Sequence, residues 1–171
     1  QADRYRVPRI AFVNKLDRTG ADYCQVVDQM NKYLDANAFP FHIPIGEEDS
    51  FIGICDIIEQ KSYLFTETDR VEAEIPKELK AKCDEARAKL VEKVAEFNDE
   101  IMEIFFAEGD VPSELLKTAA RDATLKLLIT PVFCGAAYKN KGIQLLLDAV
   151  LDYLPSPVDV GAVVGIDPDD P

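Results

Sequence analysis

Two short apolar runs, one near each end of the chain, are typical of strands that are buried on both faces. They cover residues 10–13 and 131–134. A helical spacing of apolar side chains follows each run, over residues 21–34 and 143–154. We therefore expect two strand–loop–helix units that form the two halves of one parallel α/β layer.

The pattern between these two units is different. Residues 39–67 contain short strand-like stretches separated by glycines, which predicts a small antiparallel sheet. Residues 75–106 give the strongest helical signal, with Pro76 at its start and Gly109 beyond its end. A second helix is expected over residues 113–128. The sequence thus predicts an α/β fold whose parallel sheet is interrupted by an α+β insertion.

Composition is that of a globular protein, because 47% of the 171 residues are apolar and 30% are charged. The formal net charge of −13 disfavours binding to anionic membranes and direct sequence-specific binding to nucleic acids. No apolar run is long enough to span a bilayer. Widely spaced cysteines without a C-x-x-C pair favour reduced, buried thiols of a cytoplasmic protein over a metal site or disulfides. These cysteines are Cys24, Cys55, Cys83 and Cys134.

A polar segment with Asn14, Lys15 and Asp17 follows the first apolar run. Ligands of open α/β sheets bind beyond the carboxyl ends of the strands, so these side chains are candidates for binding. The carboxylate of Asp17 can accept hydrogen bonds from both donors of a guanine edge, N1–H and the N2 amino group. A backbone N–H of Ala136 or Ala137, after the second run, can donate to O6. The methylene stem of Lys15 can cover the ring.

The same residues also explain a preference for guanine over adenine. Adenine lacks N1–H and presents an amino group in place of O6, so it would leave Asp17 partly unpaired. The amide of Asn14 can tie the two loops together. The alternative is that Asn14 and Asp17 are only turn residues after a strand.

The segments that contain these residues closely resemble the guanine-recognition stretches of the bacterial translation elongation factor G family. The resemblance covers residues 8–22 and 131–142 and continues over residues 146–150 and 152–157. Residues 43–56 look like the insertion of that family. This resemblance implies a partial P-loop-GTPase-type sheet that contains only the base-recognition half. It also implies that the chain comes from a ribosome-dependent GTPase that drives translocation. The implied partners are GTP or GDP and the ribosome, in the cytoplasm.

The resemblance also implies site residues and domain limits. It assigns guanine binding to Asn14, Lys15 and Asp17 in a base-specificity motif, and to Gly135, Ala136 and Ala137 in a second base-contact loop. The family usually has Ser where this chain has Ala136, so we expect a less firmly fixed loop with unchanged specificity. We expect the C-terminal half of a GTP-binding domain over residues 1–35 and 129–157. An inserted subdomain with a small sheet and two helices is expected over 36–128, and a linker over 158–171.

A working GTPase also needs a phosphate-binding P-loop with the pattern G-x-x-x-x-G-K-[ST]. None of the eight glycines of this chain is followed by Lys. We therefore expect the chain to be part of a longer protein and to be inactive alone, with Mg²⁺ bound only in the full-length parent. Residues 17–20 spell D-x-x-G, but they overlap the base-recognition motif and are assigned no phosphate role. The single histidine, His42, is expected to be a packed or surface residue and not a general base.

Acidic side chains are concentrated over residues 94–116, a stretch with seven acids and no Lys or Arg. One interpretation is a solvated helix face. The other is a docking surface for a basic partner, formed by Glu96, Glu100 and Glu103. In the resembled family the inserted subdomain contacts the ribosomal stalk protein, which favours the docking interpretation.

Overall fold

The computed structural model describes residues 2, 4–66 and 69–160 of the chain. Its first sheet has three parallel strands in the order β1 (Ala11–Val13), β7 (Thr130–Cys134) and β2 (Ala38–Pro40). The two apolar runs thus form neighbouring parallel strands, as the sequence predicts. All five residues of β7 are buried, which is typical of a central parallel strand.

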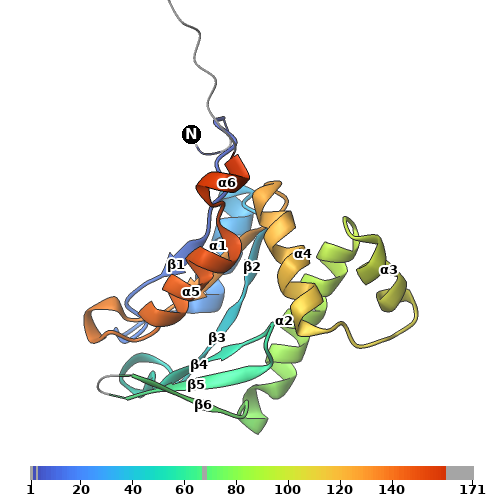
Figure 1. Ribbon diagram of the computed structural model, residues 1–171. Coiled ribbons are helices and arrows are strands. Elements are labelled where there is room, and N and C mark those ends of the chain that lie inside the picture. The colour runs from blue at the N-terminus through green and yellow to red at the C-terminus, as the bar shows by residue number, and fades with distance from the viewer. Residues whose placement is uncertain (1, 3, 67–68, 161–171) are drawn as a thin grey trace, which may run out of the picture.

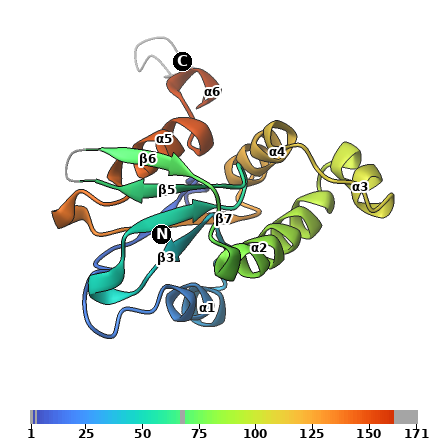
Figure 2. The same ribbon diagram turned by 90° about the horizontal axis from the view of Figure 1, so that it is seen from below.

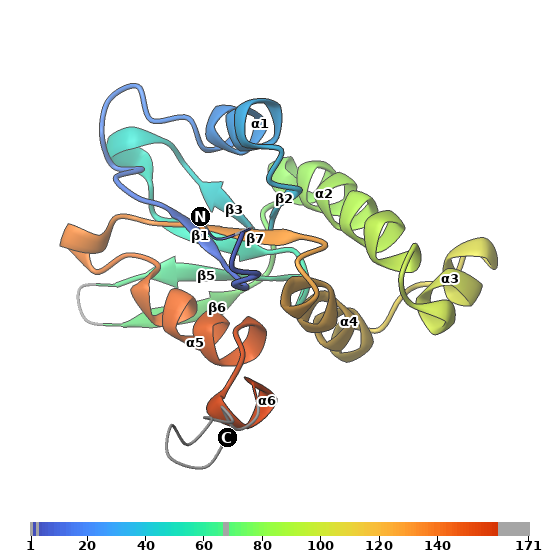
Figure 3. The same ribbon diagram turned by 90° about the horizontal axis from the view of Figure 1, so that it is seen from above.

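Two helices cover this parallel sheet from opposite sides, α1 (Tyr23–Leu34) and α5 (Ile143–Tyr153) (Figure 3). Helix α1 begins where the side chain of Asp22 accepts a hydrogen bond from the N–H of Gln25, at 2.9 Å. Between β7 and α5, the three aromatic rings of Phe41, Phe133 and Tyr153 pack against one another, edge to face or tilted. This contact joins β7 and the end of α5 to the segment that connects β2 with β3.

The second sheet is antiparallel, as predicted, with the order β3 (His42–Ile45), β4 (Gly53–Asp56), β5 (Lys61–Phe65) and β6 (Arg70–Ala73). A short 3₁₀ turn, η1 (Glu48–Ser50), connects β3 to β4. Figure 1 shows this sheet below the parallel one, with β2 running on into β3. Strand β2 lies within the span 36–128 of the expected insertion, yet it pairs with β7 in the parallel sheet.

Three helices complete the fold, α2 (Lys77–Ala95), α3 (Asp99–Phe106) and α4 (Ser113–Leu125). They gather at one side of the two sheets (Figure 2). The prediction of one continuous helix over residues 75–106 is therefore wrong. Asn98 has an extended backbone, and its side chain accepts a hydrogen bond from the N–H of Ile101, at 3.0 Å. Helix α2 has already ended at Ala95, and this cap starts α3 as a separate helix.

A buried arginine fastens α2 to its neighbours. The guanidinium of Arg87 donates hydrogen bonds to the carbonyl oxygens of Ile57, Ile58 and Val111, at 3.0, 2.6 and 2.6 Å. Because Arg87 is 7% exposed, these bonds replace most of the water that the charged group gives up. Arg87 thereby attaches helix α2 to two other segments, the turn after β4 and the segment that leads to α4.

The single histidine and three of the four cysteines lie in the interior of the fold. His42 is buried and packs against the ring of Phe133, and burial lowers its pKa to about 3, so it is a packed residue. The four cysteines are free thiols, three of them buried. Helix α6 (Pro157–Val160) reaches the start of the expected linker, and residues 161–171 lie outside the described part. No helix within the described residues is long and apolar enough to cross a membrane.

Candidate functional site

The carboxyl ends of β1 and β7 lie side by side, because Val13 is paired with Cys134. Two backbone hydrogen bonds continue this pairing into the loops. The N–H of Gly135 donates to the carbonyl of Val13 at 3.0 Å, and the N–H of Leu16 donates to that of Gly135 at 3.1 Å. The structure therefore brings together the two segments in which the sequence places the candidate residues.

Gly135 occupies a place where the chain has no room for a side chain. A Cβ added there would lie 2.3 Å from the carbonyl oxygen of Lys141 and 2.7 Å from the ring of Phe12. The missing side chain lets the first residues of the second loop approach the end of β1 closely.

Asn14 joins the two loops directly. Its Oδ1 accepts a hydrogen bond from the N–H of Ala137 at 3.0 Å and another from the N–H of Lys15 at 2.8 Å. Lys15 adopts the left-handed backbone conformation, with φ of 66°. One side chain thus fixes both the turn after β1 and the position of the second loop.

Asp17 faces the same second loop through an ion pair. Its Oδ2 lies 3.0 Å from Nζ of Lys139, in the 3₁₀ turn η2 (Ala137–Lys139). The hydrogen bond from Lys139 lowers the pKa of Asp17 below its usual value, so it further favours the ionised carboxylate. Asp17 is therefore available as an acceptor for two parallel donors. Lys139 could not be predicted as a partner of Asp17, since nothing in the motif pairs the two residues.

The backbone donors of the second loop are engaged within the protein. The N–H of Ala136 donates to the carbonyl of Lys141 at 2.9 Å, and that of Ala137 donates to Asn14. A purine O6 could therefore receive the Ala137 hydrogen bond only if this N–H turns away from Asn14. Ala136 is 1% exposed, so a side chain larger than its methyl group would press on packed neighbours.

The arrangement of two adjacent loops, with an amide that bridges them and an ionised carboxylate at their edge, matches a known type of domain. Residues 1–156 match the protein family described as the elongation factor Tu GTP binding domain. The chain belongs to this family. Domains of this family are GTP-binding domains.

A solved structure supports the same fold for this family member. The chain is similar to a protein from Thermus thermophilus whose crystal structure is known, with 28% sequence identity and a TM-score of 0.81. The match covers 93% of this chain but only 24% of the Thermus chain. The present chain therefore spans about a quarter of the length of that protein.

The acidic candidate residues lie around α3, away from the two loops of the candidate base site. Glu96 follows α2 directly and pairs with Lys93 at 2.6 Å, whereas Glu100 and Glu103 belong to α3. All three side chains are exposed. Because α2 and α3 are separate helices, the three acids are distributed over the end of one helix and the start of the next.

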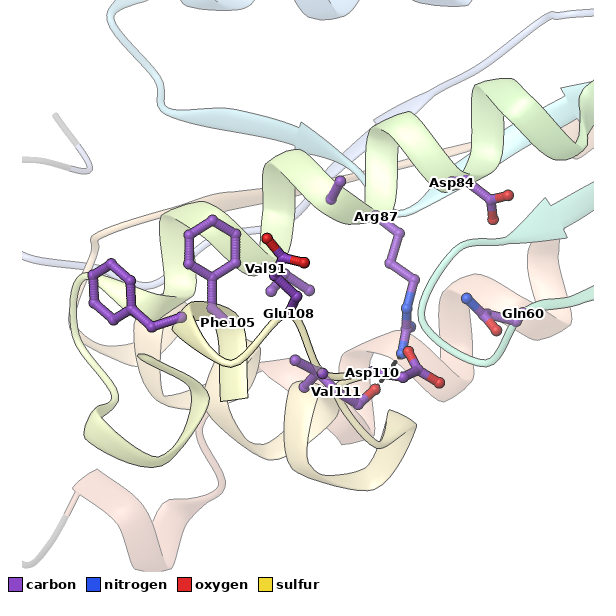
Figure 4. Close-up of a pocket in the computed structure, with 11 residues that line it drawn as sticks. Gln60, Asp84, Arg87, Val91, Phe105, Glu108, Asp110 and Val111 are labelled. Atoms are coloured by element: carbon purple, nitrogen blue, oxygen red, sulfur yellow. Dashed lines mark hydrogen bonds between the residues drawn. The ribbon is translucent and has the colours of Figure 1, made fainter. Parts of the chain in front are cut away.

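A cavity of about 580 Å³ lies between α2, α3 and the segment that leads to α4 (Figure 4). Apolar side chains line one part of it, among them Val91 and Phe105. Acidic side chains surround another part, including Glu108 and Asp110, and Arg87 reaches across its floor. Sequence reasoning missed this cavity, because it exists only where α3 turns away from α2. No group of His, Cys, Asp or Glu side chains within the described part of the chain is placed to hold a metal ion.

Proposed function

We propose that this chain is the guanine-recognition part of a translational GTPase of the elongation factor G type. The observation that carries the proposal is the hydrogen bond from Ala137 to Asn14, which holds the two loops together at the edge where Asp17 lies. In this proposal the parent protein hydrolyses GTP on the ribosome and drives translocation in the cytoplasm. Residues 1–35 and 129–157 belong to its GTP-binding domain, residues 36–128 mostly to an inserted subdomain, and residues 158–171 to a linker.

The proposed recognition follows from the hydrogen-bonding groups at the site. Asp17 accepts from N1–H and the N2 amino group of guanine, and the hydrogen bond from Lys139 favours its ionised form. When guanine binds, the N–H of Ala137 turns from Asn14 to donate to O6, while Gly135 and Ala136 form the close-packed base of the loop. The stem of Lys15 covers one face of the ring. These groups fit the base, whereas the phosphates and Mg²⁺ need the P-loop pattern that no glycine of this chain begins.

The proposal is tested by a change of base preference. In Asp17→Asn the side chain has one acceptor and one donor, which match N1–H and the C2 carbonyl of xanthine instead of the two donors of guanine. We expect the unaltered chain to bind GDP in preference to ADP and XDP, and the variant to prefer XDP. Amide NMR spectra, recorded during titration with each diphosphate, give the affinities and locate the contacts at residues 14–17 and 135–137. No shift in these residues with GDP would overturn the proposal.

A second candidate function is docking of a basic partner, proposed to be the ribosomal stalk protein, without a nucleotide role for this chain. The exposed positions of Glu96, Glu100 and Glu103, and the acidic cavity beside α3, favour it. Reversing the charge of these three residues to Lys should slow association with a stalk domain about tenfold at low salt and less at high salt.

The matched control reverses the charge of three exposed acids away from α3, which gives the same net charge: Asp28, Asp49 and Glu74. Stopped-flow association rates measured for both triple variants decide the outcome. Equal rates in the two variants would show that only net charge matters, and docking at α3 would then be rejected.

A further inference from the structure

The turn between β3 and β4, residues 46–51, touches both loops of the proposed base site. The carboxylate of Glu48 accepts a hydrogen bond from the N–H of Gly20 at 2.8 Å. On the other side, the ammonium of Lys141 donates to the carbonyl of Phe51 at 2.5 Å. These contacts join residues that are 28 and 90 positions apart in the sequence. One turn of the antiparallel sheet is therefore attached to both segments that follow the parallel strands.

The turn is well fixed by its own structure. Gly46 has φ of +80°, and a Cβ added there would lie 1.8 Å from the carbonyl oxygen of Ser50, so only glycine fits. The hydroxyl of Ser50 donates to the carbonyl of Glu47 at 2.6 Å and accepts from its N–H at 3.0 Å. Phe51 is fully buried and packs edge to face against Phe65. A turn that is anchored in this way can restrain the segments that it contacts.

Its first contact acts on the loop that carries Asp17. Gly20 lies three residues beyond Asp17, and two turn hydrogen bonds span the intervening residues. The N–H of Arg18 donates to the carbonyl of Lys15, and the N–H of Ala21 donates to that of Arg18, both at 3.1 Å. Because the loop is a chain of tight turns, the charge-assisted bond at Gly20 limits the positions that Asp17 can adopt.

Its second contact acts on the loop that carries Ala137. The backbone of Lys141 closes this loop, because its N–H donates to the carbonyl of Ala136 at 3.1 Å and its carbonyl accepts from the N–H of Ala136 at 2.9 Å. The side chain of the same residue reaches Phe51, and its ammonium also lies 5.6 Å from the centre of that ring. The turn and the second loop are thus linked through one lysine.

We propose that Glu48 and Lys141 are positioning residues for guanine recognition, acting through the turn at residues 46–51. The turn fixes the spacing between Asp17 on one loop and Ala137 on the other, so that both reach the same base edge. This inference rests on the proposed binding of guanine at these loops. Glu48 and Lys141 do not contact the base in this arrangement. Glu48 positions Asp17, and Lys141 positions Ala137, and these two residues contact the base.

The test measures GDP affinity of the 171-residue chain by amide NMR titration. Glu48→Ala removes the acceptor of Gly20 and should weaken GDP binding about five- to tenfold, somewhat less than the full value of one charge-assisted hydrogen bond because Glu48 acts on the base indirectly. Glu48→Gln keeps an oxygen that can accept, so it should recover most of the affinity. Lys141→Met keeps the apolar stem but loses the bond to Phe51, and it should weaken binding by a similar factor.

The matched control is Asp49→Ala, which removes a neighbouring exposed carboxylate from the same turn and should leave the affinity unchanged. A second comparison separates a positioning role from a purely structural one: the loss of GDP affinity on removing Glu48 is also measured in the Asp17→Asn variant. If Glu48 acts through Asp17, its removal there should cost clearly less than in the unaltered chain. Equal GDP affinity of Glu48→Ala and the unaltered chain would overturn this inference alone. Absence of GDP binding in the unaltered chain would overturn the proposed function, and this inference with it.

Discussion

At the scale of single residues, the pKa of Asp17 depends on a neighbour from the opposite loop. Lys139 lies 3.0 Å from the Asp17 carboxylate, and this hydrogen bond is the main reason that the pKa of Asp17 is lowered. The charge of Arg18 contributes in the same direction, but less. Lys139 thereby holds the Asp17 carboxylate beside the second loop, in the place that the role we propose requires.

This dependence predicts a pH effect at a single carboxyl group. A lowered pKa in the folded state means that the pair stabilises the fold above the unfolded pKa, and that this contribution is lost as the pH falls through the folded pKa. In Lys139→Met the Asp17 pKa should rise towards its ordinary value, about 3.9. Lys139→Arg retains a cationic donor, so the pKa should stay low. Carboxyl ¹³C shifts recorded against pH measure both, and an unmoved midpoint in the Met variant would contradict the assignment.

At the scale of elements, the start of α3 depends on one side chain. Asn98 accepts a hydrogen bond from Ile101, and the first turn of α3 contains Asp99 and Glu100, which complement the helix dipole. Asn98→Ala should lower the free energy of unfolding by about 1 kcal/mol, because an N–H at the helix start loses its acceptor. Asn98→Asp keeps an acceptor and is expected to remain close to the unaltered stability. Urea denaturation compares the three proteins, and an Ala variant as stable as the Asp variant would refute the role of the cap.

The elements also show what the sequence could predict and what it could not. The outer strands and helices follow from apolar spacing, because a buried strand and an amphipathic helix each leave a simple periodic pattern. The break between α2 and α3 does not interrupt that pattern, since Val94, Phe97 and Ile101 keep a helical spacing across it. A signal was present in Asn98, a good helix cap followed by two acids, but the continuous spacing outweighed it.

The candidate site was predictable only in part for a similar reason. Asn14 and Asp17 could be identified because the ends of parallel strands collect ligand-binding residues. The contacts of Glu48 and Lys141 could not, because they depend on how the antiparallel sheet lies against the parallel one. Long-range contacts of this kind leave no local pattern in the sequence.

At the scale of the whole molecule, the contacts that we propose to a nucleotide concern only its base. The net charge of −13 offers no general attraction for a triphosphate, and no glycine of the chain begins the phosphate-binding pattern. The chain alone should therefore not hydrolyse GTP, and calorimetric titration should show no GTP affinity tighter than about millimolar.

The affinities of GTP, guanosine and adenosine, compared with one another, test this prediction more directly than the affinity for GTP alone. If the chain recognises the base alone, removing all three phosphates should change little, and guanosine should bind within about threefold of GTP. Adenosine should bind more weakly than guanosine, because the Asp17 acceptor then lacks its two donors. Titration of one sample with the three ligands gives these ratios without an absolute reference. GTP binding more than about tenfold tighter than guanosine binding would reveal a phosphate contact supplied by these residues. Recognition of the base alone by this chain would then be rejected.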